Sequence, residues 1–321
     1  ALMESYLPLL QILEEAIKTK NKHAKITLGL SPTLLSLLED SEFKRLFPDW
    51  IANRLELLEC SSIDQKEAAE HLSRRIKKQF NFWNSFKGDV INRFAALKKE
   101  GILDILTCAA THGYLPLLRE TPESIHGQLK TAVREHERLF KEKPLGIWLP
   151  ECAYYEGLDQ IMSECGLKYA VLDGHGILHA NPRPRYGLYA PICTKNGVAF
   201  FGRDSESTLP VWSAKDGYPG DSLYREFHKD IGWELPIEKL NKIGIKERRP
   251  LGLKLHKVTS QNISLEEKEI YDPIRASKKV KEHAISYLNE RRSQLDRLQY
   301  SMIKEPLLVA PFDAELFGHW W

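Results

Sequence analysis

The sequence lacks the long apolar segments that mark membrane-spanning and secreted proteins. It contains no run of about 18 apolar residues, so we predict no membrane-spanning helix. Its N-terminus carries an amphipathic pattern instead of a basic segment followed by an apolar one, so we predict no signal peptide. These absences favour a cytoplasmic protein without a membrane partner.

Cysteine is sparse and the net charge is low. The 46 basic residues nearly balance the 44 acidic ones, and the basic runs are short and mixed with acids, so we expect no nucleic-acid partner. The histidine, cysteine and acidic residues match no strong zinc motif, and we predict neither a metal nor a cofactor. The cysteines are odd in number and lack CxxC spacing, which favours a reducing compartment over a disulfide framework; they are Cys60, Cys108, Cys152, Cys165 and Cys193.

Short apolar runs alternate along the chain with helical patterns. With 42% hydrophobic and 28% charged residues, the 321-residue chain can bury one large core or two modest ones. Strands without polar alternation, each followed by a helix, are typical of a buried parallel sheet, either doubly wound or closed as a barrel. We predict strands at residues 25–31, 102–108, 145–149, 168–173, 198–203 and 307–313.

Helices are predicted between these runs from the spacing of apolar residues. They cover residues 7–17, 122–141 with Thr121 as the N-cap, and 273–299, and a long helix covers 64–99 and ends before Gly101. Residues 180–250 are broken by Pro, Gly and aromatic residues and are predicted to leave the sheet as an irregular excursion. Residues 252–258 could form another strand.

Polar and aromatic side chains follow the ends of the predicted strands. Because the carboxyl ends of parallel strands form the ligand face of α/β folds, we expect Glu151 and Asp313 to meet in one cleft, both partly removed from water. The full set of strand-end residues is His112, Tyr114, Glu151, Asp173, His175, Arg203, Asp313 and Glu315.

Two carboxylates in an aromatic-lined cleft are the minimum for cleaving a glycosidic bond. One attacks or stabilises the oxocarbenium-like centre while the other protonates the departing oxygen, and their separation sets the stereochemical outcome. Sugar rings have apolar C–H faces that stack on tryptophan and tyrosine. The candidate platforms are Trp148, Tyr154, Tyr155, Trp212, Tyr218, Trp320 and Trp321.

Each of these residues also has a structural interpretation. Glu151 could stabilise a helix N-terminus, Asp313 could cap the next segment, and His112 could hold a loop. The tryptophan pair at the end of the chain could belong to the core. Their joint placement at strand ends favours a functional role, because independent structural roles would scatter over both faces of the sheet.

Several segments resemble the signature regions of glycoside hydrolase family 57. They are TCAATHGYLP (107–116), GIWLPECAYYEGLD (146–159), FFGRDSES with VWSAKDGYPGD (200–221) and APFDAELFGHWW (310–321). They occur in the family's order through nearly the whole chain and look most similar to those of its 1,4-α-glucan branching enzymes. The resemblance implies an α/β fold, an incomplete (β/α)7-type barrel with long helical and loop insertions.

The resemblance also implies roles for individual residues. Glu151 would be the nucleophile that forms a covalent glucosyl-enzyme, and Asp313 the general acid/base. His112 matches a substrate-binding histidine, and Tyr218 matches a tyrosine on a mobile loop associated with transfer over hydrolysis. The other expected substrate contacts are Trp148, Tyr154, Asp173, His175, Arg203, Trp212, His256 and Trp320.

The chain departs from the family pattern at several points. Residues 1–321 do not include the strand with a His-x-His-x-Pro motif or the helical C-terminal domain that the resemblance leads us to expect. Asp104 replaces a usual glutamate, Glu156 a common proline, and His256 an aromatic residue frequent in branching enzymes. We therefore interpret residues 1–321 as one catalytic barrel domain without its first strand, with a helical insertion at about 60–100 and an irregular excursion at about 180–250.

The sequence as a whole predicts a retaining α-glucan transglycosylase. As a branching enzyme it would cleave α-1,4 links and form α-1,6 links, with amylose, glycogen or a starch-like polysaccharide as its partner. Three alternatives stay open: a 4-α-glucanotransferase or α-amylase of the same family, a glucan-binding protein without turnover, and a metal-dependent carbohydrate deacetylase. The last would use Asp173, His175 and His179 as ligands, but their spacing matches no strong zinc motif.

Overall fold

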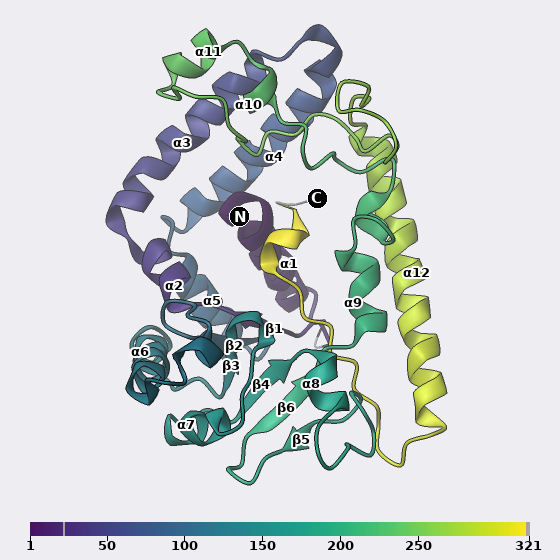
Figure 1. Cartoon of the computed structure of the whole chain (residues 1–321). Coiled ribbons are helices and arrows are strands. Elements are labelled where there is room, and N and C mark those ends of the chain that lie inside the picture. Colours follow the sequence, from purple (N-terminus) through teal and green to yellow (C-terminus); the bar gives the residue numbers. More distant parts are fainter. Residues whose placement is uncertain (22, 319–321) are drawn as a thin grey trace.

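A six-stranded sheet forms the centre of the structure, a computed structural model that describes residues 1–21 and 23–318. Five strands are parallel and the edge strand β5 is antiparallel to β6. In the described residues β1 and β5 lie at open edges, so the predicted α/β fold is confirmed, and the open sheet is consistent with an incomplete barrel (Figure 1). The spatial order is β1 (Ile26–Gly29), β2 (Leu103–Cys108), β3 (Gly146–Trp148), β4 (Tyr169–Leu172), β6 (Ala199–Gly202) and β5 (Ile192–Cys193).

Helices cover this sheet, and α1 and α6 among them lie where the periodicity predicts helices. A first hydrophobic cluster joins β1 and β2 to α1 and the helices of the N-terminal half, and a second joins β3, β4 and β6 to α6 and α7. Thr121 occupies the N-cap position of α6, as predicted, although its side chain makes no capping hydrogen bond. The helices around the sheet are α1 (Leu7–Lys18), α5 (Val90–Lys99), α6 (Pro122–Phe140), α7 (Leu158–Glu164) and α8 (Gly174–Leu178).

The predicted long helix over residues 64–99 is wrong as a single element. It is two helices, α4 (Lys66–Ser85) and α5, because Gly88 has φ +72° and a Cβ there would lie 2.4 Å from the Trp83 ring. The helical region also begins earlier than predicted, with α2 (Pro32–Glu39) and α3 (Ser41–Glu59). Helices α3 and α4 pack together as an arm that extends away from the sheet (Figure 1).

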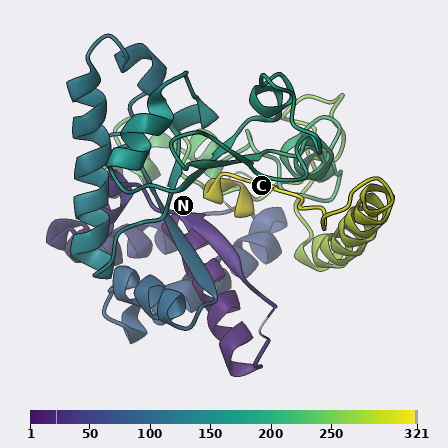
Figure 2. The same cartoon turned by 90° about the horizontal axis from the view of Figure 1, so that it is seen from below.

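The irregular excursion carries three short helices after β6: α9 (Ser205–Trp212), α10 (Ile231–Glu234) and α11 (Ile237–Lys242). Helices α10 and α11 lie at the far end of the arm (Figure 1). The long helix α12 (Pro273–Gln299) is confirmed, and it stands beside the rest of the molecule when seen from below (Figure 2). None of the helices in the described part of the chain is long and apolar enough to cross a bilayer.

Two predicted strands are wrong. Residues 252–258 make only isolated bridges, between Arg225 and Lys257 and between His256 and Ile270, instead of a ladder. Residues 307–313 are not a strand either, although the Asp204 amide donates to the Val309 carbonyl at 2.9 Å and holds this segment beside the end of β6. The segment leads into the short 3₁₀ helix η6 (Ala314–Phe317), whose N-cap is Asp313.

Candidate active site

Glu151 follows β3 in an unusual backbone conformation. It has φ 57° and ψ 25°, and Cys152 after it also has a positive φ of 54°. Two consecutive residues other than glycine in the left-handed region are rare and strained, and such strain gathers at functional sites. The Glu151 side chain is 74% exposed, so the expectation that both acids are partly removed from water is wrong for this one. The strand end presents its carboxylate to solvent.

His112 faces this carboxylate from the loop after β2. Its Nε2 lies 3.6 Å from Glu151 Oε1, and its Nδ1 lies 3.2 Å from Cys108 Sγ. Burial raises the pKa of the Cys108 thiol to about 12, so the thiol keeps its proton and can donate it to Nδ1. In that arrangement the proton on the neutral imidazole sits on Nε2 and points toward Glu151.

Asp313 lies in the same electrostatic environment as Glu151. Burial raises the pKa of the Asp313 carboxyl, and the charges of Glu315 and Glu151 raise it further, while Arg203 and His112 oppose the change. The Glu151 charge thus acts on the Asp313 carboxyl although the two acids are 162 positions apart in the sequence.

A charged group from β4 and β6 completes this end of the sheet. Asp173 Oδ2 lies 2.6 Å from His175 Nδ1, and Asp173 Oδ1 lies 4.0 Å from Arg203 Nη1. Arg203 Nη2 also donates to Cys152 Sγ at 3.7 Å. Burial raises the pKa of the Cys152 thiol to about 11, with Arg203 opposing and the carboxylates around it adding to the shift. Cys152 thus lies among the candidate residues, and no sequence pattern marked it.

The aromatic candidates near β3 are partly structural. The Tyr154 hydroxyl donates to Asp159 at 3.2 Å and its ring meets Phe200 edge-on at 4.9 Å, so it packs against the sheet. Burial and the Asp159 charge raise the pKa of Tyr154 to about 12. Trp148 ends β3, pairs in register with Cys108 and is half-buried.

The remaining candidates come from the excursion and the segment after it. Trp212, at the end of α9, is 43% exposed, and Tyr218 stacks on His283 of α12 with ring centroids 4.5 Å apart. His256 is buried with its Nδ1 4.0 Å from Glu234 of α10, and burial lowers its pKa to about 4. A buried neutral imidazole beside α10 does not belong to the strand-end group. Trp320 lies outside the described residues.

The strand-end group offers carboxylates, imidazoles and one guanidinium at the edge of the sheet. Such groups can exchange protons and hydrogen-bond the hydroxyls of a sugar. Within residues 1–21 and 23–318, no group of three or more His, Cys, Asp or Glu side chains is arranged to hold a metal ion.

Comparison with known proteins agrees with this chemistry. The profile of Glycosyl hydrolase family 57 matches residues 3–303. A 1,4-alpha-glucan branching enzyme of Thermococcus kodakarensis is 32% identical over 351 residues, which cover 100% of this chain and 49% of that protein. The chain thus spans about half the length of this relative.

Two solved structures share the fold over the full chain. The alpha-amylase AmyC of Thermotoga maritima matches with a TM-score of 0.92 and 36% identity, over 100% of this chain and 63% of its own. A GH57-type branching enzyme of Pyrococcus horikoshii matches with a TM-score of 0.84 and 32% identity, over 99% of this chain and 58% of its own.

Proposed function

The chain belongs to glycosyl hydrolase family 57, and we propose that it forms the catalytic domain of a retaining α-glucan transglycosylase that acts as a 1,4-α-glucan branching enzyme. The observation that carries the proposal is that Glu151 and His112, whose Nε2 lies 3.6 Å from Glu151 Oε1, both act on the pKa of Asp313. Two carboxyl groups in unlike environments suit the two roles that glycosyl transfer requires.

The surroundings of Glu151 and Asp313 support a different role for each acid. Glu151 is exposed and held by a fixed turn, so its carboxylate is open to the anomeric carbon of a bound glucan. Asp313 is also exposed, but its raised pKa lets it keep a proton to higher pH, as a general acid must. In the first step Glu151 bonds to C1 while Asp313 protonates the departing oxygen.

In the second step the roles of Asp313 reverse. Its carboxylate takes the proton from the acceptor hydroxyl as that oxygen attacks C1 and the bond to Glu151 breaks. Two displacements at C1 retain its configuration. Branching requires that the 6-hydroxyl of another glucan chain, rather than water, makes this second attack, so a covering loop such as that of Tyr218 would favour transfer.

The neighbouring groups fit as substrate contacts. His112 Nε2 lies 3.6 Å from Glu151 Oε1 and, when it carries a proton, can donate it to the carboxylate or to a sugar hydroxyl beside it. Asp173, His175 and Arg203 supply acceptors and donors around the same edge.

Glu151→Gln tests the proposal in the full-length protein with amylose as the substrate. The amide cannot form the glycosyl-enzyme, so turnover should fall by at least about 10³-fold. Glu156→Gln, an exposed acid in the same loop, is the matched control and should keep wild-type turnover. Retained turnover in Glu151→Gln would refute the assignment, and binding without turnover in the wild type would leave a glucan-binding protein.

Hydrolysis by an α-amylase is the second candidate, because the alpha-amylase AmyC matches the structure with a TM-score of 0.92. Product analysis separates the two activities. A branching enzyme raises the number of α-1,6 links with little change in reducing ends, whereas an amylase raises reducing ends and forms no α-1,6 links.

A further inference from the structure

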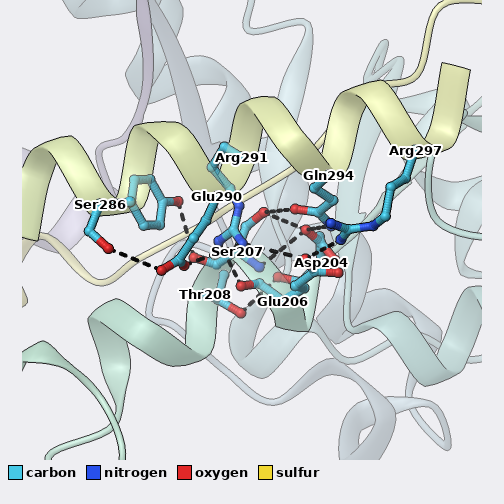
Figure 3. Close-up of polar contacts among 10 residues, drawn as sticks. Asp204, Glu206, Ser207, Thr208, Ser286, Glu290, Arg291, Gln294 and Arg297 are labelled. Atoms are coloured by element: carbon cyan, nitrogen blue, oxygen red, sulfur yellow. Dashed lines mark hydrogen bonds and ion pairs between the residues drawn. The ribbon is translucent and has the colours of Figure 1, made fainter.

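Helix α12 is fixed to α9 by a buried polar network (Figure 3). Asp204, 2% exposed, accepts hydrogen bonds from the Ser207 amide at 3.2 Å and from Gln294 Nε2 at 2.8 Å. Gln294 is 1% exposed and comes from α12. Arg291 Nη1 donates to the Glu206 carbonyl at 2.7 Å in the same interface. These contacts set the position of α12 relative to the helix that precedes the Tyr218 loop.

The polar face of α12 continues toward that loop. The Tyr287 hydroxyl donates to the Ser207 carbonyl at 3.1 Å. Residues 283, 287, 291 and 294 are spaced by four, four and three positions, which places them on one face of a helix. His283 is therefore aimed at the same excursion as the buried network, one turn before Tyr287.

His283 meets three side chains of residues 218–224. Its ring stacks on Tyr218 with centroids 4.5 Å apart and planes 28° apart. Its Nδ1 lies 2.8 Å from the Tyr224 hydroxyl and its Nε2 lies 3.6 Å from Asp221 Oδ2. Burial raises the pKa of Tyr224, so the hydroxyl keeps its proton and can donate it to Nδ1. Nε2–H then faces the Asp221 carboxylate.

The loop itself is folded tightly against the end of α9. A Cβ on Gly217 would lie 2.5 Å from the Pro210 carbonyl oxygen, and one on Gly220 would lie 2.2 Å from that of Ala214. Because the loop is this compact, a contact that holds the Tyr218 ring in place also restrains the rest of the loop. The Tyr218 hydroxyl is shielded from solvent and has no hydrogen-bond partner in the described residues. A buried hydroxyl without a partner is unfavourable, and the stacking of the Tyr218 ring on His283 offsets this cost.

We propose that His283 is a positioning residue, which holds Tyr218 in place and thereby sets how much of the glycosyl-enzyme reacts with a sugar hydroxyl instead of water. The inference rests on the proposed function. In this inference α12, which lies outside the strand-end site, controls the choice of acceptor through a stacked ring and two polar contacts.

The test compares His283→Ala, His283→Phe and His283→Gln in the full-length protein. The readout is the ratio of chains transferred to a labelled maltooligosaccharide to reducing ends released, measured beside total amylose cleavage and the thermal midpoint. We expect His283→Ala to lower the ratio by about two- to tenfold, the effect of losing an aromatic contact, while total cleavage persists. Phe restores the ring and should recover more of the ratio than Gln.

Lys281→Ala, an exposed position on the same helix, is the matched control and should keep the wild-type ratio. A wild-type ratio in folded His283→Ala overturns the inference. If His283→Ala does not fold, the comparison of His283→Phe with His283→Gln serves as the test. A transfer ratio for His283→Gln that equals or exceeds that for His283→Phe overturns the inference. If the Glu151→Gln variant keeps its turnover, the proposed function is refuted and not the role of His283. If the wild type transfers no glucan chain, both the proposed function and the role of His283 are refuted.

Discussion

Asp204 holds together three parts of the molecule, and its removal should cost far more stability than the loss of an exposed acid beside it. It caps α9 by accepting from the Ser207 amide at 3.2 Å, accepts from Gln294 Nε2 of α12 at 2.8 Å, and also binds the Ser207 hydroxyl. Its own amide donates to Val309 at 2.9 Å, in the segment that leads to Asp313.

The magnitude for Asp204→Ala follows from these contacts. Loss of an N-cap side chain costs about 1 kcal/mol. The Gln294 amide, 1% exposed, would be left buried without this acceptor, and an unsatisfied buried donor costs about 1–3 kcal/mol. The Ser207 hydroxyl keeps Gln294 Oε1 at 3.4 Å as a second partner, so it adds little. We expect a loss of about 2–4 kcal/mol in the free energy of unfolding.

Urea unfolding followed by far-UV circular dichroism measures this loss, with Glu206→Ala as the matched control. Glu206 binds Arg297 at 2.7 Å and Arg291 at 3.6 Å, but its side chain is 48% exposed. Exposed ion pairs contribute about 0–1 kcal/mol. If Asp204→Ala loses no more stability than Glu206→Ala, the buried network does not fix α9 to α12, and the support assigned to α12 loses its basis.

Two further predictions concern pH. After burial, the Glu315 charge does most to raise the pKa of Asp313, so Glu315→Gln should lower that pKa and move the high-pH limb of glucan turnover to lower pH; an unchanged limb would contradict the assignment of Asp313 as the acid. His136 is fully buried and its pKa is lowered from 6.5 to about 4, so the unfolded chain binds the proton first and stability falls as the pH drops from 6.5 toward about 4. His136→Phe should reduce this fall in urea unfolding at pH 7 and pH 5, and equal falls in both proteins would refute it.

The sheet was largely predictable, because its strands are short apolar runs whose pattern fits a buried strand and no other kind of element. Residues 102–108 and 168–173 were predicted to within about two residues at each end, as expected when both faces of a strand are buried. The break at Gly88 was not predictable from periodicity, because the apolar spacing continues through it, whereas glycine is required there by its φ of +72° and by the approach of the Trp83 ring. Residues 307–313 have the composition of a strand, but their backbone makes single hydrogen bonds, with Tyr189 and Asp204, that do not continue into a ladder.

The site was predictable where a general rule of topology applies. Glu151 follows β3, as the strand-end rule expects, whereas Asp313 follows a segment that is not a strand, so its placement beside Glu151 stays a prediction. The contacts of Cys108, Cys152 and His283 depend on left-handed turns and on packing between distant elements, and no local pattern encodes these. The same limit explains His256, whose burial beside Glu234 follows from the fold of the excursion.

The strained turn at Glu151 explains how an exposed carboxylate can be held precisely. Each left-handed residue other than glycine costs about 1–2 kcal/mol, so the turn persists only if its surroundings determine it. The Cys152 amide donates to the Leu149 carbonyl at 2.8 Å, the Ala153 amide donates to the Pro150 carbonyl at 3.1 Å, and the Cys152 side chain is buried. The backbone beneath the carboxylate is thus fixed, so in the proposed reaction Glu151 needs less ordering at each turnover than an acid on a flexible loop would. The rigidity at this position comes from the buried Cys152 and its turn, while the Glu151 side chain stays in contact with water.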